Sequence, residues 1–71
     1  MSENEFLVQL GQRIKKIRSE KNMTQLKLAA ICDFEKASMS RIESGQTNTT
    51  ILTLKKISQA LGVDVHELLK D

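Results

Sequence analysis

A turn of only three residues, Asp33 to Glu35, separates two stretches with helical apolar spacing, and it strongly constrains the fold. The first stretch, Gln25 to Cys32, is expected to be a helix that Thr24 caps through its hydroxyl. The second stretch covers about residues 36–44. Two helices joined by so short a turn cannot lie antiparallel, so they are expected to cross steeply.

A steep crossing requires a small residue where the two backbones approach, and Ala29 is placed for that role. It also requires apolar residues at fixed offsets, which are supplied by Leu28, Cys32, Phe34, Met39 and Ile42. Asp33 tolerates the left-handed conformation of a tight turn better than most residues other than glycine. These features together predict a helix-turn-helix over about residues 24–44.

The rest of the chain is also predicted to be helical, because it lacks proline and repeats apolar residues at steps of three and four. Helices are expected from about Asn4 to Lys21 and from Ile51, capped by Thr49 or Thr50, to Leu61. A short fifth helix follows Asp64, which has capping-box spacing with Glu67. Left-handed exits or stops are expected at Asn22, Gly45 and Gly62. The inward positions outside the motif are Phe6 or Leu7, Leu10, Ile14, Ile17, Leu54, Ile57, Leu61, Val65, Leu68 and Leu69.

The predicted fold class is therefore all-α: a compact five-helix bundle in which the second and third helices form the helix-turn-helix. A chain of 71 residues is expected to form one domain, residues 1–71. Its net charge of +2 is unevenly distributed. Residues 13–41 hold eight basic and three acidic side chains, a local charge of +5, so the remainder carries −3. This favours a polyanionic partner, although a solvated charged surface is the alternative.

Composition argues against several other classes. Cys32 is the single cysteine and His66 the single histidine, and neither has partner residues at catalytic or metal-ligand spacing. Neither an enzyme nor a metal or cofactor site is therefore expected. Core packing is the simpler role for Cys32, and a surface or interface role for His66. The chain shows no signal peptide or membrane-spanning run, so a cytoplasmic protein without membrane partners is expected.

The run TQLKLAAICDFEKASMSRIESGQTN resembles the helix-turn-helix core of phage-repressor regulators, the Cro, lambda-type and Xre family. The flanking runs GQRIKKIRSEKNMTQ and TLKKISQALGVDVHELL resemble that family as well, so the likeness extends over about residues 10–69. Two positions depart from the family pattern. Asp33 replaces the usual turn glycine, and Glu35 replaces a serine or threonine cap. Both put the entry angle of the third helix in question.

The resemblance implies a transcriptional regulator that binds specific sequences of double-stranded DNA. In this family the start of the third helix reaches base edges, which assigns base reading to Lys36, Ala37, Ser40 and Arg41. Arginine or lysine can donate to guanine O6 and N7, and a small apolar side chain can contact the thymine methyl group. The alternative for Lys36 and Arg41 is an ordinary surface charge.

Phosphate contacts are expected from Thr24, Gln25, Ser38, Gln46, Thr47 and Asn48, with caps or ordinary loop polarity as the alternative for each. Lys16 and Lys27 would add diffuse attraction. The resemblance also implies an ion pair between Arg18 and Glu43, which would tie the first helix to the end of the third. Arg18 would then be a structural residue instead of a DNA contact.

One recognition helix covers few base pairs, so a homodimer reading two operator half-sites is expected. Its candidate interface residues are Ile51, Val65, His66 and Leu69, with core packing as the alternative for the apolar ones. RNA polymerase is a further candidate partner, through Asp33 and Glu35.

A chain that ends after the bundle resembles stand-alone regulators: restriction-modification controller proteins, Cro-like repressors or antitoxins. The functional alternative is a protein-interaction adaptor or antitoxin-like module on the same bundle, which an acidic recognition face would favour. Neither the operator sequence nor the choice between activation and repression follows from the residues.

Overall fold

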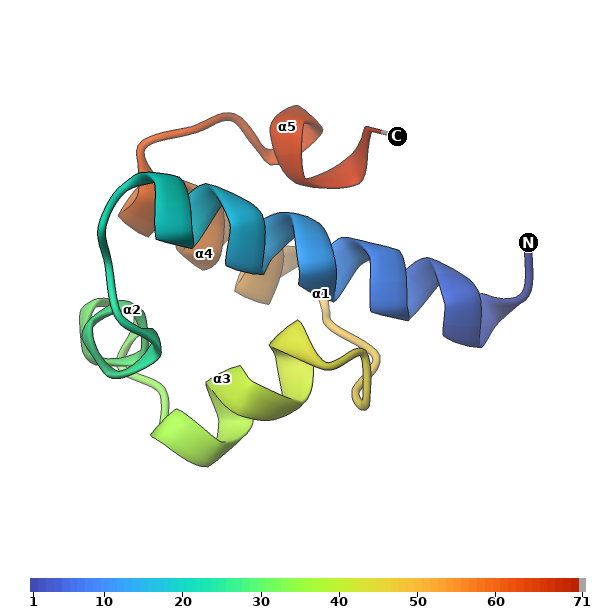
Figure 1. Cartoon of the computed structure of the whole chain (residues 1–71), viewed down its shortest axis with the longest axis horizontal. Helices are drawn as coiled ribbons and strands as arrows, with labels where there is room; N and C mark the ends of the chain where they lie inside the picture. Colours follow the sequence, from blue (N-terminus) through green and yellow to red (C-terminus); the bar gives the residue numbers. More distant parts are fainter. Residues whose placement is uncertain (71) are drawn as a thin grey trace.

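The computed structural model describes residues 1–70, which form five α-helices and no β-strand in that range (Figure 1). In chain order they are α1 (Glu3–Glu20), α2 (Gln25–Cys32), α3 (Lys36–Glu43), α4 (Ile51–Leu61) and α5 (Val65–Leu69). The expected all-α bundle is confirmed. The first four helices begin and end within one residue of their expected positions.

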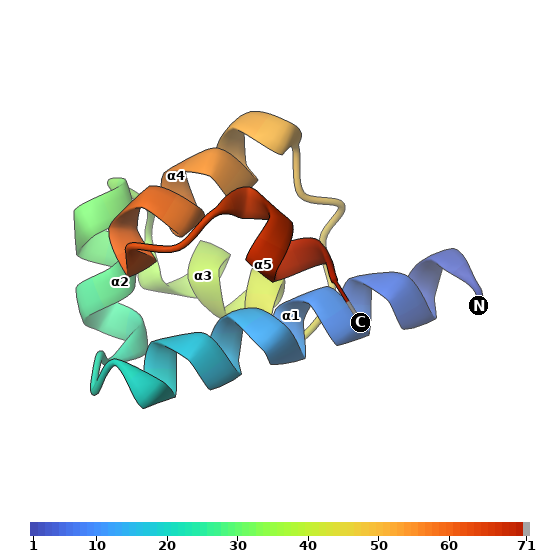
Figure 2. The ribbon, with the colours of Figure 1, turned by 90° about the horizontal axis from the view of Figure 1, so that it is seen from above.

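The first turn of α1 carries a capping box that the sequence analysis did not identify. The Ser2 hydroxyl accepts from the Glu5 N–H at 3.1 Å, and the Glu5 carboxylate accepts from the Ser2 N–H at 3.3 Å. This end of α1 projects beyond the other helices (Figure 2), and Phe6 is 45% exposed. Of the two alternatives expected to begin the apolar stripe, Phe6 therefore lies outside the core and Leu7 is half-buried, so Leu10 is the first buried member.

The expected helix ends follow from local chemistry. Asn22 and Asp33 have φ values of 57° and 60°, and Gly45 and Gly62 are also left-handed. Thr50, one of the two expected caps, accepts a hydrogen bond from the Thr53 N–H at 3.2 Å and caps α4. Threonine caps a helix start, and asparagine, aspartate and glycine tolerate the left-handed conformation at a helix end, so the helices begin and end where these residues occur.

The expected reciprocal capping box of α5 is not formed. The Asp64 carboxylate accepts from the His66 N–H at 3.0 Å and caps the helix alone. The Glu67 carboxylate lies 3.0 Å from Lys70 Nζ, because the i,i+3 spacing on a short helix brings opposite charges together.

One core joins all five helices. α1 packs against α3 and α5, α2 packs against α3 and α4, and α4 packs against α5. Figure 1 shows α1 between α3 on one side and α5 on the other. The buried apolar residues are Leu10, Ile14, Leu28, Ala29, Cys32, Met39, Ile42, Leu54, Ile57, Leu61 and Leu68. Val65 and Leu69 were expected to point inward, but Val65 is only half-buried and Leu69 is exposed.

A close backbone contact fixes α1 relative to α3. A Cβ atom on Gly11 would lie 2.4 Å from the Glu43 carbonyl oxygen and 2.6 Å from that of Ile42. Only glycine permits this approach without a shift of backbone atoms. Among residues 1–70, no helix is both long and apolar enough to cross a membrane.

Candidate nucleic-acid interface

The turn between α2 and α3 is held by backbone hydrogen bonds around one left-handed residue. Asp33 has φ 60° and ψ 41°, and the N–H of Phe34 donates to the carbonyl of Ala29 at 2.8 Å. Glu35 occupies the N-cap of α3 but makes no side-chain capping hydrogen bond, as expected for this residue type. The two departures from the family pattern therefore leave both helices intact.

The inner face of α3 determines which of its side chains face solvent. Met39 is fully buried and Ile42 nearly so, in the same core cluster as Leu28 and Ala29 of α2. Ala29 is 1% exposed, which fits the expected small residue where two helices cross closely. With these residues turned inward, the opposite face of α3 remains uncovered.

That uncovered face carries all four expected base-reading residues. Lys36, Ala37, Ser40 and Arg41 are exposed, while Ser38 is half-buried. Their spacing of one and four residues places them on one side of a helix. Two of the four are cations, and none is an acid. This is the surface chemistry that a DNA major groove accepts.

Arg18 and Glu43 form a bidentate ion pair between α1 and the last residue of α3. Arg18 Nε lies 2.7 Å from Glu43 Oε2, and Arg18 Nη2 donates to Glu43 Oε1 at 3.1 Å. The remaining guanidinium nitrogen, Nη1, donates to the carbonyl of Met23 at 2.7 Å. The two side chains are only 12% and 3% exposed. The pair is thus largely shielded from water, and all three guanidinium nitrogens of Arg18 donate to acceptors within the protein.

Gln25 extends this network to α2. Its Nε2 donates to Glu43 Oε1 at 3.0 Å, a contact that the sequence analysis did not foresee. A primary amide has two N–H donors, so one is left for another acceptor. Thr24, the cap before it, is exposed and accepts from the Lys27 N–H at 3.0 Å. The start of α2 is therefore fastened to the end of α3.

The loop after α3 brings further polar candidates beside the recognition helix. A shallow hollow is bordered by Ser38 and Arg41 of α3 and by Thr47 and Asn48 of the loop. The backbone supports this placement, because the N–H of Gln46 donates to the carbonyl of Arg41 at 2.9 Å. Three of the expected phosphate contacts thus share one surface with a base-reading candidate.

The expected interface residues differ in exposure. Ile51 is 64% exposed at the start of α4, and Leu69 is 39% exposed on α5. His66 is exposed and Val65 half-buried. Leu52 was not among the expected interface residues, yet it is 72% exposed on α4. Its position outside the apolar stripe of α4 is the sequence signal that could have predicted its exposure.

The remaining chemistry of residues 1–70 is sparse. Within that range no three side chains of histidine, cysteine, aspartate or glutamate gather as metal ligands would. Cys32 is 4% exposed, and burial raises the pKa of its thiol, partly opposed by the charge of Lys56. Lys56 itself lies 5.6 Å from the ring centroid of Phe34, within cation–π range.

Comparison with known proteins places this geometry among regulators. Residues 11–71 match a family described as a helix-turn-helix domain. The control protein C.BamHI of Bacillus amyloliquefaciens is 42% identical over 67 residues, which cover 93% of this chain and 83% of that protein. The control protein C.MunI of a Mycoplasma species is 36% identical, covering 96% of this chain and 93% of that protein.

Solved structures give the same picture. The chain superimposes on the restriction-modification controller protein C.AhdI of Aeromonas hydrophila with a TM-score of 0.85 at 31% identity, covering 87% of this chain and 94% of that one. It is also similar to SinR, a master regulator for biofilm formation, solved in complex with DNA. That match has a TM-score of 0.79 at 44% identity and covers 86% of this chain and 98% of that one.

Proposed function

This chain belongs to the helix-turn-helix domain family, and from that premise we propose that it is a transcriptional regulator that reads double-stranded DNA through α3. The observation that carries the proposal is the uncovered row of Lys36, Ala37, Ser40 and Arg41 on a helix whose other end is locked by a buried ion pair. A rigid helix that presents donors and a small apolar side chain is suited to reading base edges. The basic character of this face disfavours the adaptor alternative, which calls for an acidic one.

Within this row we assign different roles by chemistry. Arg41 and Lys36 donate to guanine, Ala37 contacts a thymine methyl group, and Ser40 donates or accepts at either kind of base pair. Each good bidentate contact contributes about 1–3 kcal/mol of discrimination against the wrong base.

Phosphate contacts on either side of α3 would fix its register. The start of α2 offers the Thr24 hydroxyl and the second N–H of Gln25, beside free backbone amides that favour an anion. The hollow beside α3 offers Ser38, Thr47 and Asn48, and Gln46 lies exposed next to it. Such contacts position a protein on the duplex but carry no sequence information.

We further propose that two copies bind as a twofold dimer through α4 and α5, by way of the exposed residues Ile51, His66 and Leu69 and the half-buried Val65. Exposed apolar side chains at the start of α4 are costly to leave in water, and Leu52 enlarges the apolar area there. A dimer would read two half-sites about one helical turn apart. The exposed acids Asp33 and Glu35 are where RNA polymerase would be contacted in an activator.

Among regulators, control of a restriction-modification system is the role best supported. The matches to C.BamHI and C.MunI extend over at least 83% of those proteins. C.AhdI, a restriction-modification controller, is matched over 94% of its chain. The SinR relatives, by contrast, are matched over 57% of their length.

The test is a titration of two labelled duplexes, one from upstream of the gene for this protein and one unrelated, at several salt concentrations. Wild type is compared with Arg41→Ala and with Lys27→Ala, an exposed cation on α2. Arg41→Ala should remove the preference for the specific duplex. Lys27→Ala should instead weaken binding to both duplexes equally and lower the slope of log affinity against log salt concentration by about 1. Binding without preference, unchanged by Arg41→Ala, would contradict base reading through α3.

A further inference from the structure

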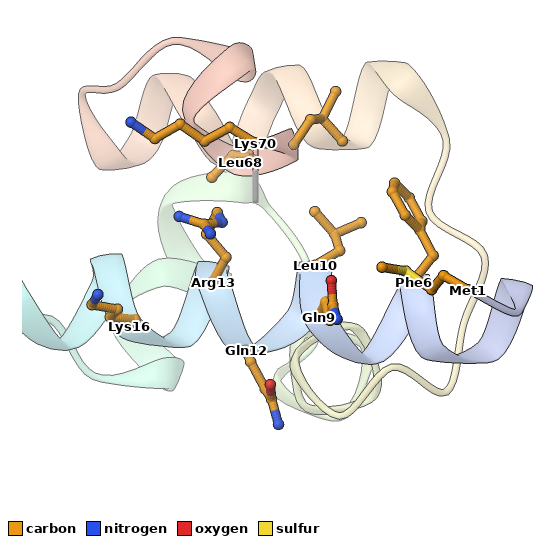
Figure 3. A pocket seen from close by; sticks show the side chains of 10 residues that line it. Met1, Phe6, Gln9, Leu10, Gln12, Arg13, Lys16, Leu68 and Lys70 are labelled. Carbon is orange, nitrogen blue, oxygen red and sulfur yellow. The ribbon is translucent and has the colours of Figure 1, made fainter.

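A groove of about 490 Å³ runs between α1 and α5 (Figure 3). Leu10 and Leu68 form its floor and are 6% and 1% exposed. Phe6 stands at one end beside Met1, where Figure 3 shows its ring rising from α1. The floor residues belong to the core, and Leu69 of the proposed dimer interface also lines the groove, whereas none of the proposed DNA-contacting residues does.

The other end of the groove is basic. Arg13 and Lys16 of α1 and Lys70 of α5 line it, and Figure 3 shows all three at the end opposite Phe6. No aspartate or glutamate lines the groove within residues 1–70. Lys70 is paired with Glu67, but in the same range neither Arg13 nor Lys16 has an ion-pair partner. The groove is therefore apolar at one end and positively charged at the other.

We propose that the groove binds an acidic amphipathic segment of a partner protein. An apolar side chain of that segment would pack against Phe6 over the leucine floor, and its carboxylates would face Arg13 and Lys16. Complementarity of both charge and polarity favours this occupant. Phe6 is 45% exposed, so the apolar end opens to solvent and suits a chain segment better than an enclosed small molecule.

The position of the groove adds a functional consequence. Because α3 and α5 lie on opposite sides of α1 (Figure 1), a segment in the groove and a duplex on α3 would not compete for the same surface. The protein could thus hold a partner while it is bound to DNA. The proposal goes beyond DNA binding and does not depend on it, since the groove is complete in the free protein.

The test uses a fluorescently labelled helical peptide with leucines along one face and glutamates along the other, added to the full chain. Fluorescence anisotropy should show saturable binding that weakens as salt is raised. Arg13→Glu should weaken it about tenfold, because attraction is replaced by repulsion. Lys15→Glu makes a similar charge change at an exposed α1 residue outside the groove and should have little effect. Phe6→Ala should also weaken binding, and circular dichroism verifies that each variant is folded.

Other outcomes would overturn the proposal. If Arg13→Glu and Lys15→Glu reduced the affinity for the peptide equally, the peptide would be attracted to the charge of α1 as a whole and not to the groove. Displacement of the peptide by an unlabelled duplex would place it on the DNA surface. If dodecanoate bound and the peptide did not, the groove would be a site for a small anionic amphiphile. Self-association abolished by Phe6→Ala would identify the occupant as a second copy. A failure of the titration with DNA would leave these results unaffected.

Discussion

Arg18 and Glu43, which are 25 positions apart in the sequence, join through two hydrogen bonds of 2.7 and 3.1 Å. The same carboxylate accepts from Gln25, so three elements meet on one buried acid. Because Glu43 is the last residue of α3, these hydrogen bonds fix the end of α3 against α1 and α2.

The ion pair should show strong energetic coupling. Arg18→Met leaves the Glu43 carboxylate without its cationic partner in a site where the side chain is 3% exposed, and we expect a loss of about 3–5 kcal/mol in the free energy of unfolding. Arg18→Met combined with Glu43→Leu should recover part of that loss, because no buried charge then remains. Urea unfolding of the four proteins of this cycle measures the coupling. Additive single effects would show that the pair contributes no coupling to stability.

Gly11 should be intolerant of even one extra methyl group. Gly11→Ala would place a Cβ atom 2.4 Å from the Glu43 carbonyl oxygen, so α1 and α3 must move apart. We expect a net loss of about 1–3 kcal/mol in stability, although alanine is the better helix former. Ser19→Ala, at an exposed position of the same helix, should change stability by less than about 0.5 kcal/mol. A Gly11→Ala variant as stable as wild type in thermal unfolding would contradict the close approach.

The helices themselves were predictable because their ends depend on neighbouring residues. Thr24 caps α2, Asp33 leaves it in the left-handed conformation, and Gly45 follows α3, each for reasons contained in a few residues of sequence. The exposure of Phe6 was not predictable in this way. It depends on where the other helices stop covering α1, which no local pattern records.

The same division applies to the candidate site. The exposed row on α3 follows from the inward positions of Met39 and Ile42, so helical periodicity was sufficient to find it. The hydrogen bond from Gln25 to Glu43 and the groove beside Arg13 were missed. Both arise where helices that are distant in sequence pack together, and residue spacing along the chain does not predict which side chains meet at such contacts. The capping box expected for α5 does not form, and Glu67 pairs with Lys70 instead.

Stability should depend on the protonation of Cys32 at alkaline pH. Burial raises the pKa of this thiol above its ordinary value, so the folded protein favours the neutral form more than the unfolded chain does. The resulting stability is fully present below about pH 9 and is lost as the pH rises toward the folded pKa, by at most about 1.4 kcal/mol per pH unit. In urea unfolding, the stability difference between wild type and Cys32→Ala should therefore be constant at neutral pH and narrow above pH 9. A difference independent of pH would contradict the effect.

Dimerisation should fail when charge is placed at the start of α4. Ile51 is 64% exposed, and Ile51→Lys would bring two like charges into a proposed twofold interface. We expect sedimentation to show a monomer, and DNA binding to weaken because the two half-sites are then engaged separately. Ile31→Lys is the matched control, since Ile31 is 50% exposed on α2 and lies outside the proposed interface. If Ile31→Lys dissociated the dimer and Ile51→Lys did not, the interface would lie on α2 instead. If neither variant changed an observed dimer, the exposed residues of α4 would have no part in holding it.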